Sequence, residues 1–307
     1  MIVAAGLSPA WQSIMRFASL VPGEVNRATA TWSCASGKVL NVAVALSHLG
    51  AECRAVTVLG GAPAIETARE FAALGIDLVA VPTRATTRTC TTLLDDAAGQ
   101  TTELVENAAG ITEVEQRSFR EAYAKGVAEA RLVVLSGSLP AGAPQSLYGD
   151  LMAVTPCPVV LDARGPELLE AIGRQPLLVK PNREELARTL DVAITSDDAL
   201  LEGMQALRGR GANWVAVTDG PRSIFVVGPE GMFRLIPPQL ATVENPIGCG
   251  DCLAAGFAQA TVQGRSPLAA LRYGVACATD NCRSLFAGRL DRGLVAAWED
   301  QVRVEAL

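Results

Sequence analysis

Short apolar runs alternate with helix-like segments along most of this 307-residue chain, and this alternation restricts the folds open to it. The expected strands are apolar runs bounded by turn residues, at positions 1–7, 53–59, 132–135, 159–162, 177–179, 214–218 and 224–227. The expected helices are at positions 37–49, 64–73, 114–130, 166–171, 183–190, 196–208 and 252–262. Strands separated by helices form βαβ units, so we predict an α/β fold with a mostly parallel sheet covered on both faces.

Two stretches, 25–33 and 88–105, interrupt this alternation because they are rich in Thr, Val and Leu with β-type periodicity. Neither is expected to lead into a helix of its own, and a glycine-bearing turn at 95–100 makes the second a predicted hairpin. We expect the two to pair as a small sheet over the ligand edge of the core. The predicted division is a core of residues 1–11, 34–83 and 107–307 and a β-sheet lid of residues 12–33 and 84–106.

Charge and hydropathy exclude several kinds of partner. The chain has 32 acidic and 26 basic side chains, a balance that argues against a nucleic-acid partner because phosphate binding needs a basic face. No run of about 18 apolar residues without charge is present, so no membrane span is expected. The first residues contain no cationic segment, which argues against a signal peptide.

The histidine and cysteine content limits the chemistry. His48 is the only histidine, which excludes a multi-histidine metal centre and makes a carboxylate the expected general base of any enzyme. We expect His48 to be a structural or surface residue. The eight cysteines lie mostly in apolar segments, and we interpret them as reduced thiols of a cytoplasmic protein.

The run Asn-Pro-Ile-Gly-Cys-Gly-Asp at 245–251 is the strongest candidate for a chemical site. Gly248 and Gly250 allow successive backbone N–H groups to point into one hollow, and the helix that follows adds partial positive charge. Such a loop suits a phosphoryl group in transfer, and Asp251 could accept a proton from an attacking hydroxyl. A glycine turn capped by an aspartate would explain the bare pattern equally well.

The same run contains a C-x-x-C pair, Cys249 and Cys252, with Cys277 and Cys282 further along. A redox motif of this type is expected near the first βαβ unit of a short domain, and a four-cysteine zinc site would place two ligands in the glycine loop. We favour small buried thiols beside a reactive loop over either function.

Three other polar segments stand where expected strands end or helices begin. Residues 36–41 open a helix and place Gly37, Lys38 and Asn41 in its first turn, which suits an anion and hydroxyl groups. Ser138 follows a buried strand, at the carboxyl edge where open α/β sheets bind ligands. The run Lys-Pro-Asn-Arg-Glu-Glu at 180–185 also follows a strand and begins a helix.

Taken together, these segments resemble the phosphofructokinase-B (ribokinase-like) family of sugar kinases. Residues 245–251 match its C-terminal signature, 36–41 its N-terminal glycine motif, and 180–185 its Asn-x-x-Glu motif. The runs at 8–10, 22–27, 87–88, 102–103 and 136–140 look like the 1-phosphofructokinase and tagatose-6-phosphate kinase branch, which phosphorylates a sugar phosphate. The resemblance implies a Rossmann-like three-layer αβα sandwich with a β-sheet lid that forms a homodimer.

Roles follow from the resemblance, position by position. Asp251 would be the catalytic base, and the amides of Gly248, Cys249 and Gly250 would form the anion hole. The implied cofactors are ATP and Mg²⁺, bound by Lys180, Asn182, Glu185, Thr218 and Gly220, with Asn182 and Glu185 holding the metal through water. The implied sugar-phosphate residues are Gln12, Gly37, Lys38, Asn41, Arg88, Arg27 and Ser138, with Lys38, Arg88 and Arg27 at the phosphate.

Three departures from the family pattern concern the acceptor pocket. Gln12 stands where the branch has an aspartate that binds sugar hydroxyls, and Gln can donate as well as accept hydrogen bonds. Ser36 and Val39 replace glycines of the N-terminal motif. The identity of the sugar therefore stays open.

Two alternatives share the fold: a kinase of an unphosphorylated sugar or nucleoside, and a non-catalytic sugar-phosphate sensor. Gln12 and Val39 favour the sensor, whereas Asp251 and Glu185 disfavour it. A NAD-binding Rossmann enzyme is less compatible, because no G-x-G-x-x-G run follows the first expected strand.

Overall fold

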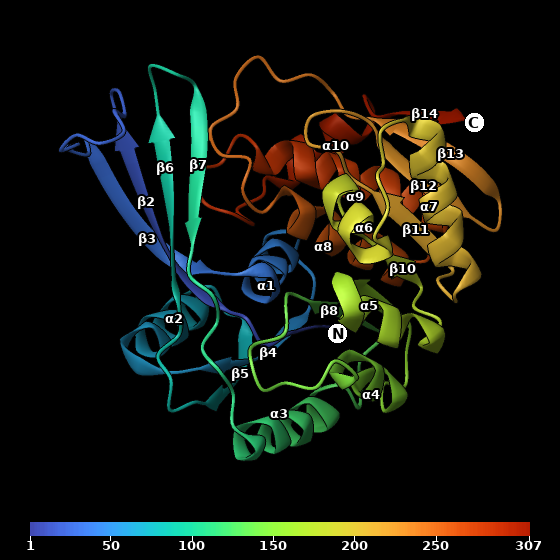
Figure 1. The fold of residues 1–307 in the computed structure, drawn as a ribbon, viewed down its shortest axis with the longest axis horizontal. Helices are drawn as coiled ribbons and strands as arrows, with labels where there is room; N and C mark the ends of the chain where they lie inside the picture. Colours follow the sequence, from blue (N-terminus) through green and yellow to red (C-terminus); the bar gives the residue numbers. More distant parts are fainter.

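The computed structural model describes all 307 residues, and its largest element is a ten-stranded sheet in the order β14-β13-β12-β11-β10-β9-β8-β1-β4-β5 (Figure 1). The parallel strands are β1 (Ile2–Ala5), β4 (Cys53–Leu59), β5 (Asp77–Pro82), β8 (Leu132–Ser136), β9 (Val159–Asp162), β10 (Leu178–Val179) and β11 (Trp214–Val217). An antiparallel edge follows, made of β12 (Ile224–Gly228), β13 (Gly231–Ile236) and β14 (Arg303–Ala306). The predicted mostly parallel sheet is confirmed, although β5, β13 and β14 were not among the expected strands.

Two helix layers cover the sheet, and β1 shows how alternation divides the core between them. Ile2 and Ala4 pack in one hydrophobic cluster, whereas Val3 and Ala5 pack in the other. The helices of the first layer are α1 (Lys38–His48), α2 (Gly61–Ala73), α8 (Cys249–Val262), α9 (Pro267–Asn281) and α10 (Arg292–Glu299). Those of the second are α3 (Glu113–Gly126), α4 (Leu147–Ala153), α5 (Gly165–Ala171), α6 (Arg183–Leu190) and α7 (Asp197–Gly209). The predicted three-layer αβα sandwich is confirmed, with α4, α9 and α10 as additions.

Helices α8 and α9 approach each other closely because glycines face the contact. A Cβ atom at Gly256 would lie 2.6 Å from Cys277 Sγ, and one at Gly274 would lie 2.6 Å from the Leu253 carbonyl oxygen. Phe257 of α8 is fully buried, and its truncation to alanine would cost about 3–5 kcal/mol. The buried α8–α9 pair is therefore a rigid base for the loop at the start of α8.

The second sheet has four strands in the order β3-β2-β6-β7: β2 (Ala10–Phe17), β3 (Ala30–Ser36), β6 (Thr89–Asp95) and β7 (Gln100–Val105). The predicted hairpin is confirmed, since β6 and β7 pair antiparallel with Asp95 opposite Gln100.

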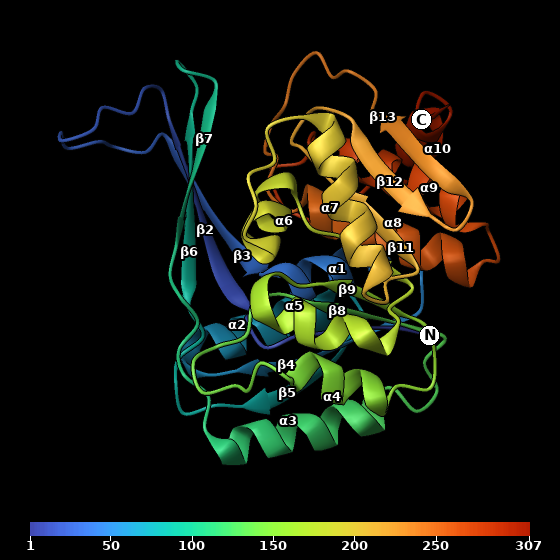
Figure 2. The same cartoon turned by 45° about the vertical axis from the view of Figure 1, so that its right-hand side comes forward.

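Two expectations about the small sheet were wrong. The two stretches do not pair directly, because the unpredicted strand β2 lies between β3 and β6, and β3 is followed at once by α1. Figure 2 shows this sheet standing beside the main body, with the β2–β3 loop extending furthest from it.

No helix combines the length and the apolar character that crossing a lipid bilayer requires.

Candidate active site

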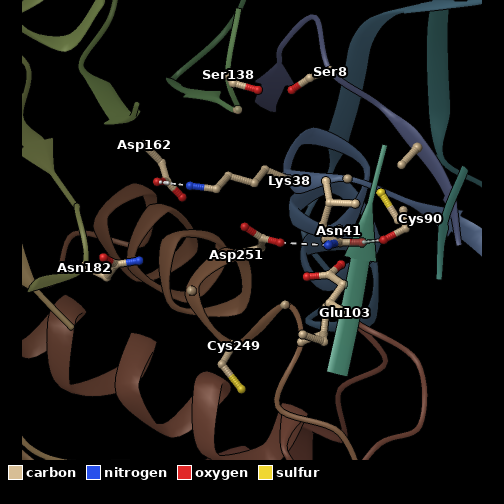
Figure 3. Close-up of a pocket in the computed structure, with 18 of the residues that line it drawn as sticks. Ser8, Lys38, Asn41, Cys90, Glu103, Ser138, Asp162, Asn182, Cys249 and Asp251 are labelled. Carbon is tan, nitrogen blue, oxygen red and sulfur yellow. Dashed lines mark hydrogen bonds and ion pairs between the residues drawn. The ribbon is translucent and has the colours of Figure 1, made fainter. Parts of the chain in front are cut away.

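A cavity of about 430 Å³ lies where the small sheet meets the carboxyl ends of the central strands. Residues that follow β1, β8, β9, β10 and β11 line it, which is the edge where open α/β sheets bind ligands. The predicted site residues that the cavity brings together are Gln12, Gly37, Lys38, Asn41, Arg88, Ser138, Lys180, Asn182, Glu185, Thr218, Gly248, Cys249, Gly250 and Asp251. Figure 3 shows Asp251 near the middle, between Asn41 and Asp162.

Two predicted residues lie outside the cavity lining. Arg27 is exposed on the β2–β3 loop, at the part of the small sheet that projects from the body (Figure 2). Gly220 is exposed in the turn after β11, with φ +57°, although Thr218 at the end of that strand does line the cavity. His48 is also absent from the lining, and its Nδ1 lies 3.2 Å from the Leu290 carbonyl oxygen, in agreement with a structural role.

The loop that precedes α8 has the geometry of an anion site. Gly248 has φ +86°, and a Cβ atom there would lie 2.5 Å from Ala287 Cβ, so only glycine fits without strain. The amides of Gly250 and Asp251 have no acceptor within the chain, because they belong to the first turn of the helix. These free donors line the cavity beside the Asp251 carboxylate and can receive phosphoryl oxygens.

The Asp251 carboxylate is buried and oriented by one strong contact. Asn41 of α1 donates a hydrogen bond from Nδ2 to Asp251 Oδ2 at 2.7 Å, so the first turns of α1 and α8 meet at this carboxylate (Figure 3). Burial, reinforced by Asp162, raises the pKa of Asp251 to about 6, against the opposing effects of Lys38, Asn41 and Lys180. A carboxylate with such a pKa is still ionised at neutral pH and is a stronger base than an exposed one.

Asp162 was not among the predicted site residues, yet it is the most buried acid of the cavity. Its Oδ1 lies 2.8 Å from Lys38 Nζ and its Oδ2 lies 3.1 Å from Lys180 Nζ. Burial alone would raise its pKa, but Lys180 and Lys38 outweigh burial and hold the pKa below its usual value. The available sequence signal was an aspartate as the last residue of an expected buried strand, at the ligand edge of the sheet.

Lys38 extends from the start of α1 toward Asp162 (Figure 3). Its Nζ is also 3.7 Å from Glu185 Oε1, and Asp162, Glu185 and Asp251 together raise its pKa although burial acts in the opposite direction. The ammonium group therefore lies among the acids of the central strands, and it stays protonated at neutral pH.

Asn182 and Glu185 cap α6 reciprocally. Asn182 Oδ1 accepts from the Glu185 amide at 2.7 Å, and Glu185 Oε2 accepts from the Asn182 amide at 3.0 Å. Of the Glu185 carboxylate oxygens, only Oε1 takes no part in these capping hydrogen bonds. No three or more acidic, His or Cys side chains lie together in a way that could hold a metal ion. The donor set fits Mg²⁺, which keeps several of its waters and needs few carboxylate contacts, and it offers no all-protein cage.

The side of the cavity under the small sheet is built differently. Arg88 donates to three backbone carbonyls, those of Ser8, Pro9 and Glu106, and forms no ion pair. Gln12 is buried, and its Nε2 donates to Thr92 Oγ1 at 2.8 Å. Glu103 of β7 completes this wall; the residue is exposed, but partial desolvation at the cavity raises the pKa of its carboxyl group against the opposing effect of Arg88.

The cysteines do not form the sites that the C-x-x-C spacing suggested as alternatives. All eight are free thiols, and with no three-ligand group present a zinc site has no support. Cys252 Sγ lies 3.2 Å from Asn281 Oδ1, whereas Cys249 Sγ lies 3.2 Å from Cys282 Sγ. The pair in contact is therefore Cys249 and Cys282, which sequence spacing did not indicate.

Comparison with known proteins identifies the class of protein to which this fold and site belong. Residues 8–285 match the pfkB family of carbohydrate kinases. The chain belongs to this family, and it is an ATP-dependent sugar kinase.

Two solved structures illustrate the similarity. Phosphofructokinase-2 from Escherichia coli, determined in complex with substrates and products, is 25% identical with a TM-score of 0.88, over 97% of this chain and 98% of that one. A possible 1-phosphofructokinase from Thermotoga maritima is 21% identical with a TM-score of 0.92, over 100% of both chains. The second likeness concerns the fold alone.

Proposed function

We propose that this kinase transfers the γ-phosphoryl group of ATP to a hydroxyl of a small sugar that already carries a phosphate, of the fructose-1-phosphate or tagatose-6-phosphate type. The observation that carries the proposal is Arg88. Its guanidinium lines the cavity, is fixed by three backbone carbonyls, and has no carboxylate partner within ion-pair distance. A fixed cation without a counter-ion is suited to bind a phosphate on the acceptor.

The transfer step is assigned to the loop at the start of α8. Asp251 accepts the proton of the attacking hydroxyl, while Asn41 keeps the carboxylate oriented through its 2.7 Å hydrogen bond. The free amides of Gly250 and Asp251 bind the oxygens of the transferred group, and Lys180 lies beside Gly250, with Nζ 3.0 Å from where a Cβ would stand. Backbone donors and a buried lysine thus face the position where negative charge accumulates.

The nucleotide side is assigned to Lys180, Asn182, Glu185 and Thr218, all of which line the cavity. Mg²⁺, when bound, supplies charge neutralisation at the phosphate oxygens. Glu185 Oε1 and the Asn182 side chain would hold it through its waters. Lys38 contacts both Asp162 and Glu185, so it keeps these two acids in place between the nucleotide and acceptor sides.

The small sheet serves as the lid. Gln12 and Glu103 line the cavity from β2 and β7, and Arg88, one residue before β6, ties the base of the lid to the carbonyls of Ser8 and Pro9. Closing this sheet over the acceptor would exclude water, which otherwise competes for the phosphoryl group. Escherichia coli phosphofructokinase-2, whose structure with fructose-6-phosphate resembles this chain, supports a phosphorylated acceptor.

Assembly through the lid is part of the proposal. A tetrameric form of Escherichia coli phosphofructokinase-2 is a structural neighbour, and the lid strand β7 of this chain exposes Leu104 and Val105. Sedimentation of the purified protein, with Leu104→Glu as the matched variant, tests this: a dimer that the substitution dissociates supports it, and a wild-type monomer contradicts it.

A substrate panel tests the activity. The purified protein is incubated with Mg-ATP and fructose, ribose, adenosine, fructose-1-phosphate, fructose-6-phosphate or tagatose-6-phosphate, and ADP formation is measured. We expect kcat/KM for at least one sugar phosphate to exceed that of its unphosphorylated sugar by about 100-fold, the worth of a charge-assisted phosphate contact. Equal or higher kcat/KM with an unphosphorylated sugar or adenosine would contradict the proposal.

A further inference from the structure

Cys249 and Cys282 are in contact at the edge of the active site. Cys249 is the first residue of α8 and lines the cavity, and Cys282 is the C-cap that directly follows α9. Their Sγ atoms are 3.2 Å apart, whereas Cys252 and Cys277 are buried inside the helix pair. Both residues of the contacting pair are partly exposed, and Cys249 borders the open cavity.

The end of α9 also holds the phosphoryl-binding loop in place. The Cys282 carbonyl accepts from the amides of Glu244 and Asn245, at 2.7 and 3.3 Å. Asn281 donates from Nδ2 to the Ile247 carbonyl at 2.9 Å and lies 3.3 Å from Cys249 Sγ. Any change in the contact between the two cysteines is therefore transmitted directly to the loop.

A disulfide would draw the two cysteines together. The sulfur atoms would have to approach by about 1.2 Å, from 3.2 Å to the roughly 2.05 Å of an S–S bond. Gly248, which precedes Cys249, is already packed against Ala287, so any part of this approach that the backbone takes up falls on the first turn of α8. The amides of Gly250 and Asp251 belong to that turn.

We propose that Cys249 and Cys282 form a reversible disulfide that draws the first turn of α8 toward α9 and thereby inactivates phosphoryl transfer. The inactivation rests on the function proposed above for this loop. The disulfide itself rests on the contact between the two sulfur atoms.

The chemistry balances with a small-molecule disulfide as oxidant. The Cys282 thiolate attacks one sulfur of that disulfide, which forms a mixed disulfide and releases a first thiolate. Cys249 then gives up its proton to solvent and attacks Cys282 Sγ, which forms the intramolecular bond and releases a second thiolate. Two protein thiols lose two electrons, and the small disulfide gains them as two thiols.

The order of these steps follows from the hydrogen bond between the thiols. Either sulfur can donate in this contact, and with Cys249 as the donor the bond lowers the pKa of Cys282 although burial opposes it. The same bond and burial raise the pKa of Cys249. Cys282 is therefore the thiol that ionises first and attacks.

The test compares the protein in reduced and oxidised glutathione buffers. Free thiols are alkylated, and cross-linked peptides are identified by mass spectrometry. ATP and ADP affinities are measured by calorimetry, because neither binding measurement needs an acceptor sugar. We expect a Cys249–Cys282 linked peptide, an affinity for ATP reduced about 10-fold with that for ADP unchanged, and full recovery with dithiothreitol. Kinase activity with the best acceptor of the substrate panel should fall about 100-fold in the oxidised protein.

Matched variants separate this disulfide from general thiol damage. Cys282→Ser should keep its ATP affinity in oxidised buffer, whereas Cys157→Ser, at a partly exposed cysteine outside the cavity lining, should respond as the wild type does. The proposal is overturned if no linked peptide forms, if ATP and ADP affinities fall together, or if Cys282→Ser remains sensitive. If the reduced protein phosphorylates no sugar, the proposed function is contradicted. The detection of the Cys249–Cys282 linked peptide does not depend on that activity and still tests the disulfide.

Discussion

The two ends of the cavity are built on different principles. The transfer end, which comprises Asn41, Asp162, Lys180 and the loop Gly248–Asp251, belongs to the ten-stranded core, and the three side chains and Asp251 are each less than 7% exposed. The lid end, which comprises Gln12, Arg88 and Glu103, belongs to the four-stranded sheet and the residue beside it, and β7 is exposed along most of its length. The transfer end is held by the buried core, whereas at the lid end only Arg88 and Gln12 are fixed by hydrogen bonds and β7 is open to solvent. We therefore expect the chemistry to depend on the core and the choice of acceptor to depend on the lid.

Removing the base should have the largest effect. Asp251→Asn retains the shape of the side chain and an oxygen that Asn41 can reach, but it cannot accept a proton. We expect kcat to fall about 10³-fold or more, with ATP affinity by calorimetry within about twofold of wild type. A kcat within tenfold of wild type would show that the transfer end does not work through this carboxylate.

Gly248→Ala should reduce kcat about 100-fold, because its Cβ would collide with Ala287 and displace the free amides of α8. Gly264→Ala is the matched control: its φ of +87° is nearly the same, but nothing lies within 4 Å of its Cβ. The control should lose some stability by thermal melting and retain its kcat. Equal losses of kcat in both variants would mean that backbone strain, and not the position of the loop, determines activity.

Arg88→Ala tests the lid end. KM for the sugar phosphate should rise about 10- to 100-fold with KM for ATP nearly unchanged, since we propose that the fixed guanidinium binds the acceptor phosphate. Arg27→Ala serves as control because Arg27 is exposed on the β2–β3 loop, and its KM values should match wild type. A larger rise in the KM for ATP than in the KM for the sugar phosphate would show that Arg88 serves nucleotide binding and not acceptor binding.

The contact between Arg16 of β2 and Glu244 joins the small sheet to the segment that leads into the transfer loop, four residues before Gly248, and we expect it to couple the two ends. Arg16→Ala should raise the acceptor KM only about two- to fivefold, as expected for a half-exposed ion pair. Arg54→Ala breaks a similar pair with Asp77, on β4 and β5 away from the cavity, and should leave steady-state constants unchanged. Identical effects of the two substitutions would argue against any coupling.

The core was readily predicted from sequence because strand and helix periodicity are local. The motif residues of the transfer end were found for a related reason: Gly248, Gly250 and Asp251 are adjacent in the chain, and their geometry is set by one helix start. Helix α9 was missed because a helix buried on most sides, with Gly274 and small residues facing α8, shows little amphipathic periodicity.

Contacts between residues that are far apart in the chain could not be predicted from the sequence. The ion pair of Lys38 with Asp162 joins residues 124 positions apart, and only the tertiary fold brings Lys38 to the central acids. Strand β2 was missed because it pairs with β6, a strand distant in sequence, and because the polar Gln12 interrupts the apolar residues of its buried face. The contact of Cys249 with Cys282 likewise depends on how α8 and α9 pack.

The pH dependence of kcat with saturating ATP and acceptor tests the central claim, that a buried carboxylate at the start of α8 is the general base. Asp162, Lys38 and Lys180 are the charged groups that face Asp251, and its pKa of about 6 predicts a plateau near neutral pH. Below that pKa the carboxylate is protonated, so kcat should fall about tenfold per pH unit. Because a sugar phosphate also titrates near pH 6, the residual activity of Asp251→Asn is measured in parallel and should lack this acid limb. A wild-type kcat that stays constant down to about pH 5, or an acid limb that persists in Asp251→Asn, would contradict the account.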